Sequence, residues 1–204
     1  LGNLMAAFHF EKAVSDYNKN MLKDRESALK SGDEFHKKEM LPIIGCVFNV
    51  CANYLDKTRK DNGDQMVFLA KNKNGYQNLI KLASLSYTKG KYYVPRIDKG
   101  LIEQYHDDII VLSGNSYGEI PHLILNVGEK QAEESLIWWK SLFKDDFYIE
   151  INRFEIESED RLNQVLVDLA NKHAVKIVAT NNTFYIEQKD AVAHDILLCV
   201  KDNE

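Results

Sequence analysis

The residues that could do chemistry in this chain lie just after its apolar runs. The stretch ATNNTFYI (179–186) follows the apolar run VKIV, which indicates the end of a buried strand. In α/β folds, catalytic and metal-binding side chains gather beyond the carboxyl ends of strands. This place holds two asparagines and a phenylalanine, where a carboxylate and an imidazole would hold a metal ion.

Other strand ends and the histidines predict no metal site either. The residues at the other predicted strand ends are Val47, Asn115, Arg153 and Phe154, and none of them is a good ligand. The six histidines form no HxH or HxxxH pair, although tight zinc sites need several nitrogen or sulfur ligands around one ion. A lone histidine such as His194 is better interpreted as a packed or capping group.

Glu150 and the cysteines are the remaining candidates for reactive groups. Cys46 and Cys51 are an odd number of residues apart, so on one strand they face opposite sides and are interpreted as core thiols. Glu150 could act as a general base if it points inward, but pairing with a neighbouring Arg or Lys is the favoured interpretation, with Arg96 and Arg153 as candidates. No GxSxG, GxxxxGK or GxGxxG motif occurs, which leaves nucleophilic hydrolysis and nucleotide binding without support.

The segment KGKYYVPR combines basic and aromatic residues. Such a combination can bind phosphates or single strands of nucleic acid. The residues concerned are Lys89, Lys91, Tyr92, Tyr93 and Arg96. A loop packed by its own aromatic rings is the simpler alternative.

Strands and helices alternate along the chain, which predicts an α/β fold with a mostly parallel sheet. The predicted strands cover 42–51, 65–72, 107–115, 146–154 and 175–181. The predicted helices cover 75–88, 129–143, 158–174 and 189–200, after an initial helical segment from residue 3 to 30. The charged stretch 18–39 lacks a clear apolar stripe and is interpreted as a solvated surface insertion without chemistry.

Composition narrows the class of protein. The chain has 204 residues, of which 45% are hydrophobic and 28% charged, enough to bury a core. Its net charge of −5 provides no global basic field, so contact with nucleic acid would need a local patch. Three cysteines without a CxxC pair favour a reducing cytoplasm. No apolar run approaches the length of a membrane span, so no contact with a membrane is expected.

Several blocks of sequence occur in an order that matches a known family. They are PIIGCVFNV, AKNKNGYQNLIKLAS, YYVPRID, VLSGNSYGEIP, KIVATNNTFY and AHDILLC. With these blocks the chain resembles, over nearly its whole length, the PHP (polymerase and histidinol phosphatase) domain at the start of bacterial DNA polymerase III alpha subunits, the replicative C-family polymerases. The resemblance implies a distorted (β/α)7 barrel. It also implies that residues 1–204 are a piece of this domain that begins after the first strands, and that 189–204 start the connection to the polymerase core.

The resemblance further implies that the metal ligands of this family have been replaced. In metal-bearing members, His, Asp, Glu and Cys at the strand ends hold a cluster of divalent ions. The matching positions here are Leu1, Val47, Gln65, Asn115, Phe154, Asn182 and Phe184. Valine and phenylalanine offer no electron pair, and an amide brings no charge to offset the dehydration of a divalent ion. We therefore expect a degenerate site without metal or catalytic residues, with the apolar replacements filling the former cavity.

The function implied by the resemblance is that of a structural and docking module in DNA replication. The parent chain would be a DNA-directed DNA polymerase whose core uses Mg²⁺, and this segment would have no cofactor. The implied partners are the polymerase core of the same chain, DNA through that chain, a proofreading exonuclease subunit and other replisome subunits, in the bacterial cytoplasm. The alternative is a metal-dependent phosphoesterase or 3′–5′ exonuclease, which would need ligands from outside this segment together with Glu150 and His194.

Overall fold

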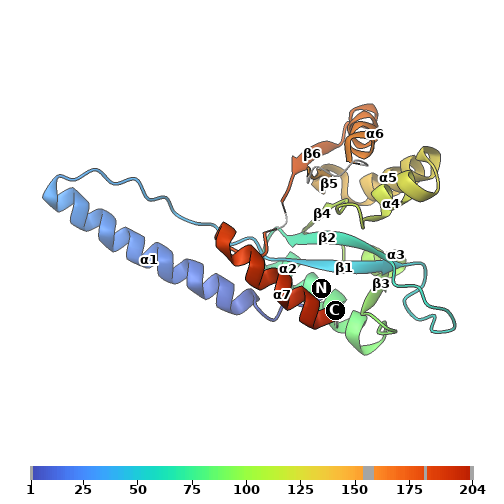
Figure 1. The fold of residues 1–204 in the computed structure, drawn as a ribbon, viewed down its shortest axis with the longest axis horizontal. Helices are drawn as coiled ribbons and strands as arrows, with labels where there is room; N and C mark the ends of the chain where they lie inside the picture. Colours follow the sequence, from blue (N-terminus) through green and yellow to red (C-terminus); the bar gives the residue numbers. More distant parts are fainter. Residues whose placement is uncertain (1, 154–158, 182, 203–204) are drawn as a thin grey trace.

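The strands of the chain form one open sheet (Figure 1). The computed structural model describes residues 2–153, 159–181 and 183–202. The strands are β1 (Gly45–Cys51), β2 (Asp64–Ala70), β3 (Arg96–Asp98), β4 (Ile109–Leu112), β5 (Phe147–Ile151) and β6 (Lys176–Ala179). The α-helices are α1 (Ala7–Ser31), α2 (Lys73–Thr88), α3 (Lys99–Gln104), α4 (Glu119–Asn126), α5 (Glu129–Phe143), α6 (Glu159–Lys172) and α7 (Ala191–Asp202), with 3₁₀ turns η1 (Lys144–Asp146) and η2 (Gln188–Asp190).

The strand order in the sheet is β3-β1-β2-β4-β5-β6. The pairs β1–β3, β4–β5 and β5–β6 are parallel, as predicted. Strand β2 is antiparallel to both of its neighbours, so the predicted mostly parallel sheet is a mixed one at this strand. The connection from β1 to β2 contains no helix, and parallel neighbours are usually joined by a helical crossover. The sheet is not closed, since β3 and β6 are its edges.

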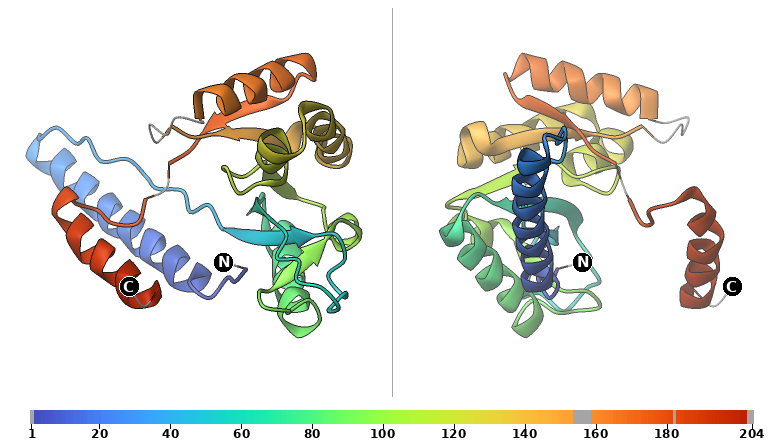
Figure 2. Two further views of the ribbon diagram at one scale, coloured as in Figure 1. Left: turned by 45° about the vertical axis from the view of Figure 1, so that its right-hand side comes forward. Right: turned by 90° about the vertical axis from the view of Figure 1, so that its left-hand side faces the viewer.

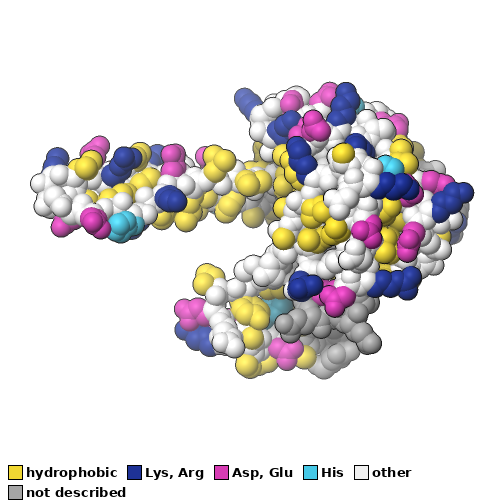
Figure 3. Space-filling model, turned by 90° about the horizontal axis from the view of Figure 1, so that it is seen from above, with side chains coloured by type: hydrophobic (Ala, Val, Ile, Leu, Met, Phe, Trp, Pro, Cys, Tyr) yellow, Lys and Arg dark blue, Asp and Glu magenta, His cyan; other side chains and the backbone are white. Residues whose placement is uncertain are grey.

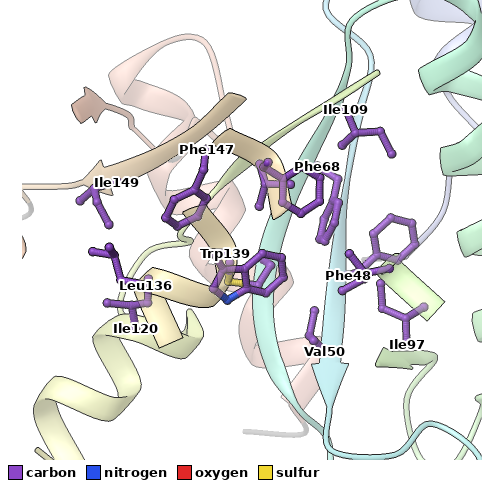
Figure 4. Close-up of a cluster of buried hydrophobic side chains, with 14 of the residues drawn as sticks. Phe48, Val50, Phe68, Ile97, Ile109, Ile120, Leu136, Trp139, Phe147 and Ile149 are labelled. Atoms are coloured by element: carbon purple, nitrogen blue, oxygen red, sulfur yellow. The ribbon is translucent and has the colours of Figure 1, made fainter. Parts of the chain in front are cut away.

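The core lies between one face of the sheet and helices α2 to α6 (Figures 1 and 2). Aromatic rings from three elements meet at its centre (Figure 4). The ring of Phe68 in β2 meets that of Trp139 in α5 edge-on at 6.2 Å between centroids. The same Trp139 stacks on Phe147 of β5 at 6.2 Å and an interplanar angle of 15°. Both Phe68 and Trp139 are fully buried, so α5 is fixed against the centre of the sheet.

The opposite face of the sheet is less well covered. Strand register places Val47, Val67, Leu112 and Tyr148 in one row across β1, β2, β4 and β5. Of these, only Leu112 is buried, whereas the other three are half-buried. In a barrel this face would be the interior, and the mixed α/β sheet seen here is consistent with a partial barrel.

Three short elements were not predicted from the sequence, namely β3, α3 and α4. Helix α4 carries Pro121 at its third position, where a backbone N–H has no partner within the helix and a proline is tolerated. Strand β3 has only three residues and begins with Arg96, an unusual residue for a buried strand. The periodic patterns that identify longer elements cannot develop over such lengths.

Helix α1 and the segment after it form an arm that extends from the body (Figures 1 and 3). The helix continues to Ser31, so the charged stretch from residue 18 begins inside it, and Gly32 ends it with a φ of 76°. The following segment runs back along the helix. The side chain of Asn18 donates to the Met40 carbonyl at 2.8 Å and accepts from the Met40 amide at 2.9 Å. Whether 18–39 is an insertion relative to the family stays a prediction.

Helix α7 lies apart from the core. Among its described side chains none is buried, and Val192, Ile196, Leu197 and Val200 are between 59% and 71% exposed. Figure 2 shows the helix beyond the sheet. None of the described helices has the length and apolar character needed to cross a membrane.

Candidate functional site

The candidate site lies where five strands end. Because β1, β3, β4, β5 and β6 run in the same direction, their carboxyl ends share one edge of the sheet, which we call the carboxyl edge. After β4 the chain turns through Gly114, whose φ is 78°. A Cβ at this glycine would collide with the carbonyl oxygen of Gln65, so only glycine lets the turn approach β2 so closely.

Glu150 is the buried charge of the carboxyl edge. It lies near the end of β5, on the face opposite the core, and is only 6% exposed. Its backbone N–H donates to Ser113 Oγ at 2.9 Å. Its Oε1 accepts a hydrogen bond from Thr180 Oγ1, whereas Oε2 has no hydrogen-bond partner among the described residues. The expectation that Arg96 or Arg153 pairs with Glu150 is therefore wrong.

A network of amides continues from Glu150 across the strand ends. Asn152 Nδ2 donates to Thr180 Oγ1 at 2.8 Å and to the Thr180 carbonyl at 3.0 Å. Asn163 of α6 in turn donates to the Asn152 carbonyl at 2.9 Å. These bonds tie β5, β6 and α6 together, so the position of the Glu150 carboxylate is fixed by its neighbours.

Two cavities adjoin this network. One is a small cavity of about 20 Å³, lined in part by Glu150, Asn115, Asn152 and Asn163. That volume holds about one water molecule. The other is an open cleft of about 900 Å³ between the ends of β5 and β6 and the start of α6, lined mostly by polar side chains. The arrangement can hold a water or a proton near Glu150. Glu159 also lines the small cavity and Asp160 the open cleft, both from the start of α6.

Four of the seven predicted degenerate positions lie within the described residues. Val47 and Gln65 are on the neighbouring strands β1 and β2, and Gln65 donates its backbone N–H to the Tyr117 carbonyl at 2.8 Å. The Oδ1 of Asn115 accepts from the Tyr117 N–H at 3.1 Å, which makes this residue a turn cap. Leu1, Phe154 and Asn182 lie outside the described residues.

Phe184, the fourth of these positions, does not fill a cavity. Its side chain is 70% exposed, and its ring stacks on His194 of α7 at 5.1 Å between centroids. Val47 is only half-buried. The expectation that the apolar replacements fill the former metal cavity is therefore wrong for Phe184, and for Val47 it stays a prediction.

The residues present do not fit a metal cluster. In the part of the chain that the structure describes, no group of three or more His, Cys, Asp or Glu side chains could hold an ion. The enzyme alternative would use Glu150 and His194 together, but these two side chains have different neighbours. Glu150 accepts a hydrogen bond from Thr180, whereas the ring of His194 packs against Phe184 and Tyr185. No catalytic step through a metal can be derived from these side chains.

The cysteines of β1 are core thiols, as predicted. Cys46 and Cys51 are 5% and 6% exposed. Burial is the main reason that the pKa of each thiol is raised to about 11. Thiols with such a pKa carry almost no thiolate at neutral pH and are poor nucleophiles.

The predicted nucleic-acid patch is only partly exposed. Lys89, Lys91 and Tyr93 face solvent, and Tyr92 is half-buried. Arg96 is fully buried, and its guanidinium donates to the backbone carbonyls of Gly90, Asp61, Asp56 and Tyr54 at 2.8 to 3.4 Å. Arg96 therefore cannot contact a ligand in solution, and it holds the surrounding loops in place.

A polar cluster at the start of α4 was missed from the sequence. Glu119 accepts from Lys99 Nζ at 2.7 Å and from Trp139 Nε1 at 2.9 Å, so it satisfies the only polar group of a buried indole. His122 Nδ1 lies 2.8 Å from Asp64 Oδ1. Burial raises the pKa of Asp64, and the nearby His122 opposes this shift. Since Asp64 and His122 are 58 residues apart, no local motif could have signalled this pair.

The fold and the carboxyl edge define a class of protein, an α/β chain with a partial barrel whose polar residues gather at the strand ends. The chain belongs to the PHP domain family, whose model matches residues 5–154. Among curated proteins, it is similar to the DNA polymerase III subunit alpha of several bacteria.

Three of these relatives illustrate the extent of the similarity. The protein of Borreliella burgdorferi is 38% identical over 182 residues, which cover 85% of this chain and 15% of the relative. That of Treponema pallidum is 33% identical over 204 residues, covering 98% and 16%. That of Thermus aquaticus is 38% identical over 177 residues, covering 82% and 14%. The chain thus spans about 15% of the length of these curated relatives.

Proposed function

We propose that the chain is the PHP domain of a DNA polymerase III alpha subunit that takes part in DNA replication in the bacterial cytoplasm. The observation that carries this proposal is the match of 85% and 98% of the chain to the alpha subunits of Borreliella burgdorferi and Treponema pallidum. The parent chain would then be a DNA-directed DNA polymerase, a nucleotidyltransferase whose polymerase core uses Mg²⁺ and contacts DNA.

We further propose that the domain acts as a structural and docking module with a degenerate metal site. Support comes from the residue types Val47, Gln65, Asn115 and Phe184 at positions where metal-bearing relatives are expected to have ligands. Without charged ligands, the protein has nothing to offset the dehydration of a divalent ion. One buried carboxylate, that of Glu150, does not replace the several that a two-metal site uses.

The partners of such a module would be the polymerase core of the same chain, a proofreading exonuclease subunit and other replisome subunits. Two exposed apolar regions are available for docking. Leu22, Leu29 and Leu41 on the arm are between 51% and 85% exposed, and the α7 side chains named above form the second region. Helix α7, within 189–204, is the candidate for the connection to the polymerase core.

One observation favours a second function, that of a metal-dependent phosphoesterase or 3′–5′ exonuclease. Glu150 Oε2 is buried without a hydrogen-bond partner among the described residues, which costs free energy, and a catalytic role is one explanation for such a group. In this alternative, Glu150 would act together with ligands from beyond the described residues.

The test is elemental analysis of the intact protein, purified without chelator, together with an assay of phosphoesterase and 3′–5′ exonuclease activity. We expect no stoichiometric Zn, Mn or Fe, and no nuclease activity that Glu150→Gln abolishes. The control is Glu187→Gln, which removes an exposed carboxylate on the segment before α7. Stoichiometric metal, lost on chelation together with an activity that depends on Glu150, would establish the enzyme alternative instead.

A further inference from the structure

Two loops beside the carboxyl edge are joined into one surface by Arg96. The first loop, residues 52–63, connects β1 to β2, and the second, residues 89–95, connects α2 to β3. The buried guanidinium donates to Asp61 and Asp56 carbonyls of the first loop at 2.9 and 2.8 Å, and to the Gly90 carbonyl of the second at 3.1 Å. The two loops lie together at the end of β1 (Figure 2). The backbones of the two loops are therefore held beside each other.

This joined surface is strongly basic. Its exposed cations are Lys57, Arg59, Lys60, Lys89 and Lys91. Within the described residues, none of these five forms an ion pair with a carboxylate. A local concentration of positive charge in a chain of net charge −5 points to an anionic partner.

The acidic residues of the first loop are turned toward its own backbone. Asp56 accepts from the N–H and hydroxyl of Thr58 at 2.8 and 2.7 Å. Asp61 accepts from the Ala52 N–H at 3.1 Å and the Gly63 N–H at 3.0 Å. The bonds from Thr58 are the main reason that the pKa of Asp56 is lowered, and the nearby Arg59 contributes to the shift. The loop thus uses its carboxylates to hold its shape and presents its cations to solvent.

An exposed aromatic ring stands among these cations. Tyr93 is 67% exposed and has a φ of 61°, a left-handed conformation that is uncommon for a residue with a bulky side chain. Its ring meets Tyr92 edge-on at 4.7 Å, and Lys60 Nζ lies 5.2 Å from its centroid. Strained backbone of this kind is associated with functional sites, and here it occurs at a tyrosine whose side chain stays largely exposed.

We propose that this surface, formed by Lys57, Arg59, Lys60, Lys89, Lys91 and Tyr93, binds a single strand of nucleic acid. The five cations contact phosphates, and an unpaired base stacks on Tyr93. An acidic protein segment would pair with the cations equally well, but its carboxylates would not stack on the exposed ring of Tyr93. The ring therefore favours nucleic acid over an acidic protein segment. A duplex keeps its bases stacked inside, which leaves a single strand as the fitting form.

The test measures binding of a fluorescent 20-residue oligothymidylate to the intact protein by anisotropy, over a series of salt concentrations. A triple variant, Lys57→Gln, Lys60→Gln and Lys91→Gln, removes three phosphate contacts. The slope of log affinity against log salt is expected to fall in magnitude by about 2, since each contact on a single strand contributes about 0.7. The matched control variant carries Lys12→Gln, Lys23→Gln and Lys38→Gln on the arm. It has the same net charge as the first triple variant and should keep the wild-type slope.

A second measurement locates the strand. An oligothymidylate with 5-iodouracil substitutions is crosslinked to the protein, and the modified peptide is identified by mass spectrometry. We expect the crosslink at Tyr93 and its loss in Tyr93→Leu, which leaves every charge in place. The proposal is overturned if no crosslink falls within 52–63 or 89–95, or if the two triple variants have equal slopes. It is also overturned if polyglutamate displaces the oligothymidylate equally well from wild type and from Tyr93→Leu. Neither readout involves metal or nuclease activity, so the result is independent of the proposed structural role.

Discussion

At the scale of single residues, the unpaired oxygen of Glu150 gives the sharpest test of the carboxyl edge. In Glu150→Gln, the side-chain oxygen can still accept from Thr180 Oγ1, while the buried charge is removed. A neutral amide costs less to bury than an unpaired charge. We therefore expect the free energy of unfolding of this variant at pH 7 to be at most about 1 kcal/mol below that of wild type, or to exceed it. Urea unfolding measures this directly.

The companion variant Glu150→Ala separates charge from hydrogen bonding. It leaves Thr180 Oγ1 without its acceptor beside a small cavity, and the expected loss is about 1–3 kcal/mol. If Glu150→Gln were as destabilising as Glu150→Ala, the charge itself would be stabilising. The carboxylate would then have a cationic partner that the described residues do not provide.

The buried thiols give a prediction about pH. Burial raises the pKa of Cys46 and Cys51 from 9.0 to about 11 in the folded protein. Between pH 9 and 11, the unfolded chain therefore binds fewer protons at these sites than the folded chain, and rising pH favours unfolding. We expect the free energy of unfolding to fall over this interval, and to fall less steeply in the double variant Cys46→Ala, Cys51→Ala. Urea unfolding at pH 8, 9.5 and 10.5 compares the two, and equal pH dependence would contradict the assignment.

At the scale of elements, the side chain of Asn18 makes two of the contacts that hold the arm together, and the ion pair of Lys37 with Asp24 makes another. Asn18→Ala removes both hydrogen bonds to the Met40 backbone, which hold the returning segment against α1. We expect trypsin to cleave after Lys37 and Lys38 several times faster, because the segment opens locally before it is cut. Mass spectrometry of the early fragments measures the rate. The control is Asn20→Ala, an exposed position on the same helix, and equal cleavage of both variants would show that Asn18 does not hold the segment.

The sequence predicts long elements well and short ones poorly. Helices α2, α5 and α6 repeat apolar residues over several turns, and their positions agree with the predicted ranges. Strand β3 and helix α3 are too short for a periodic signal. The reversal of β2 also escapes such patterns, because a buried strand has the same alternation in either direction.

The candidate site also has a part that the sequence predicts and a part that it does not. Its carboxyl edge could be predicted, since chain order and crossovers place the strand ends together. Its hydrogen bonds could not, because Glu150 and Thr180 are 30 residues apart and Arg96 reaches carbonyls 35 to 42 residues away. A basic residue next to tyrosines indicates a binding patch in sequence, and only packing shows that Arg96 supports the patch from within.

At the scale of the whole molecule, stability is unevenly distributed. The core cluster consists of residues from the sheet and helices α2 to α6, whereas α1 buries only Val14 and Met21. We expect amides of α1 and α7 to exchange with a lower opening free energy than those of α2 and β5. Native-state hydrogen exchange with mass spectrometry measures this difference. Equal protection across all four elements would mean that the arm and α7 unfold together with the core.

The paired hydrogen bonds of Asn18 have a consequence for chemical ageing of the protein. The side-chain amide acts like an extra peptide group, because it supplies one donor and one acceptor to the backbone of Met40. Hydrolysis of this amide to an acid would exchange the donor for a second acceptor, and the new carboxylate oxygen would face the Met40 carbonyl. A single deamidation at Asn18 would therefore weaken the attachment of the returning segment to α1 without any change in the gene, and would leave the ion pair between Lys37 and Asp24 at 2.8 Å.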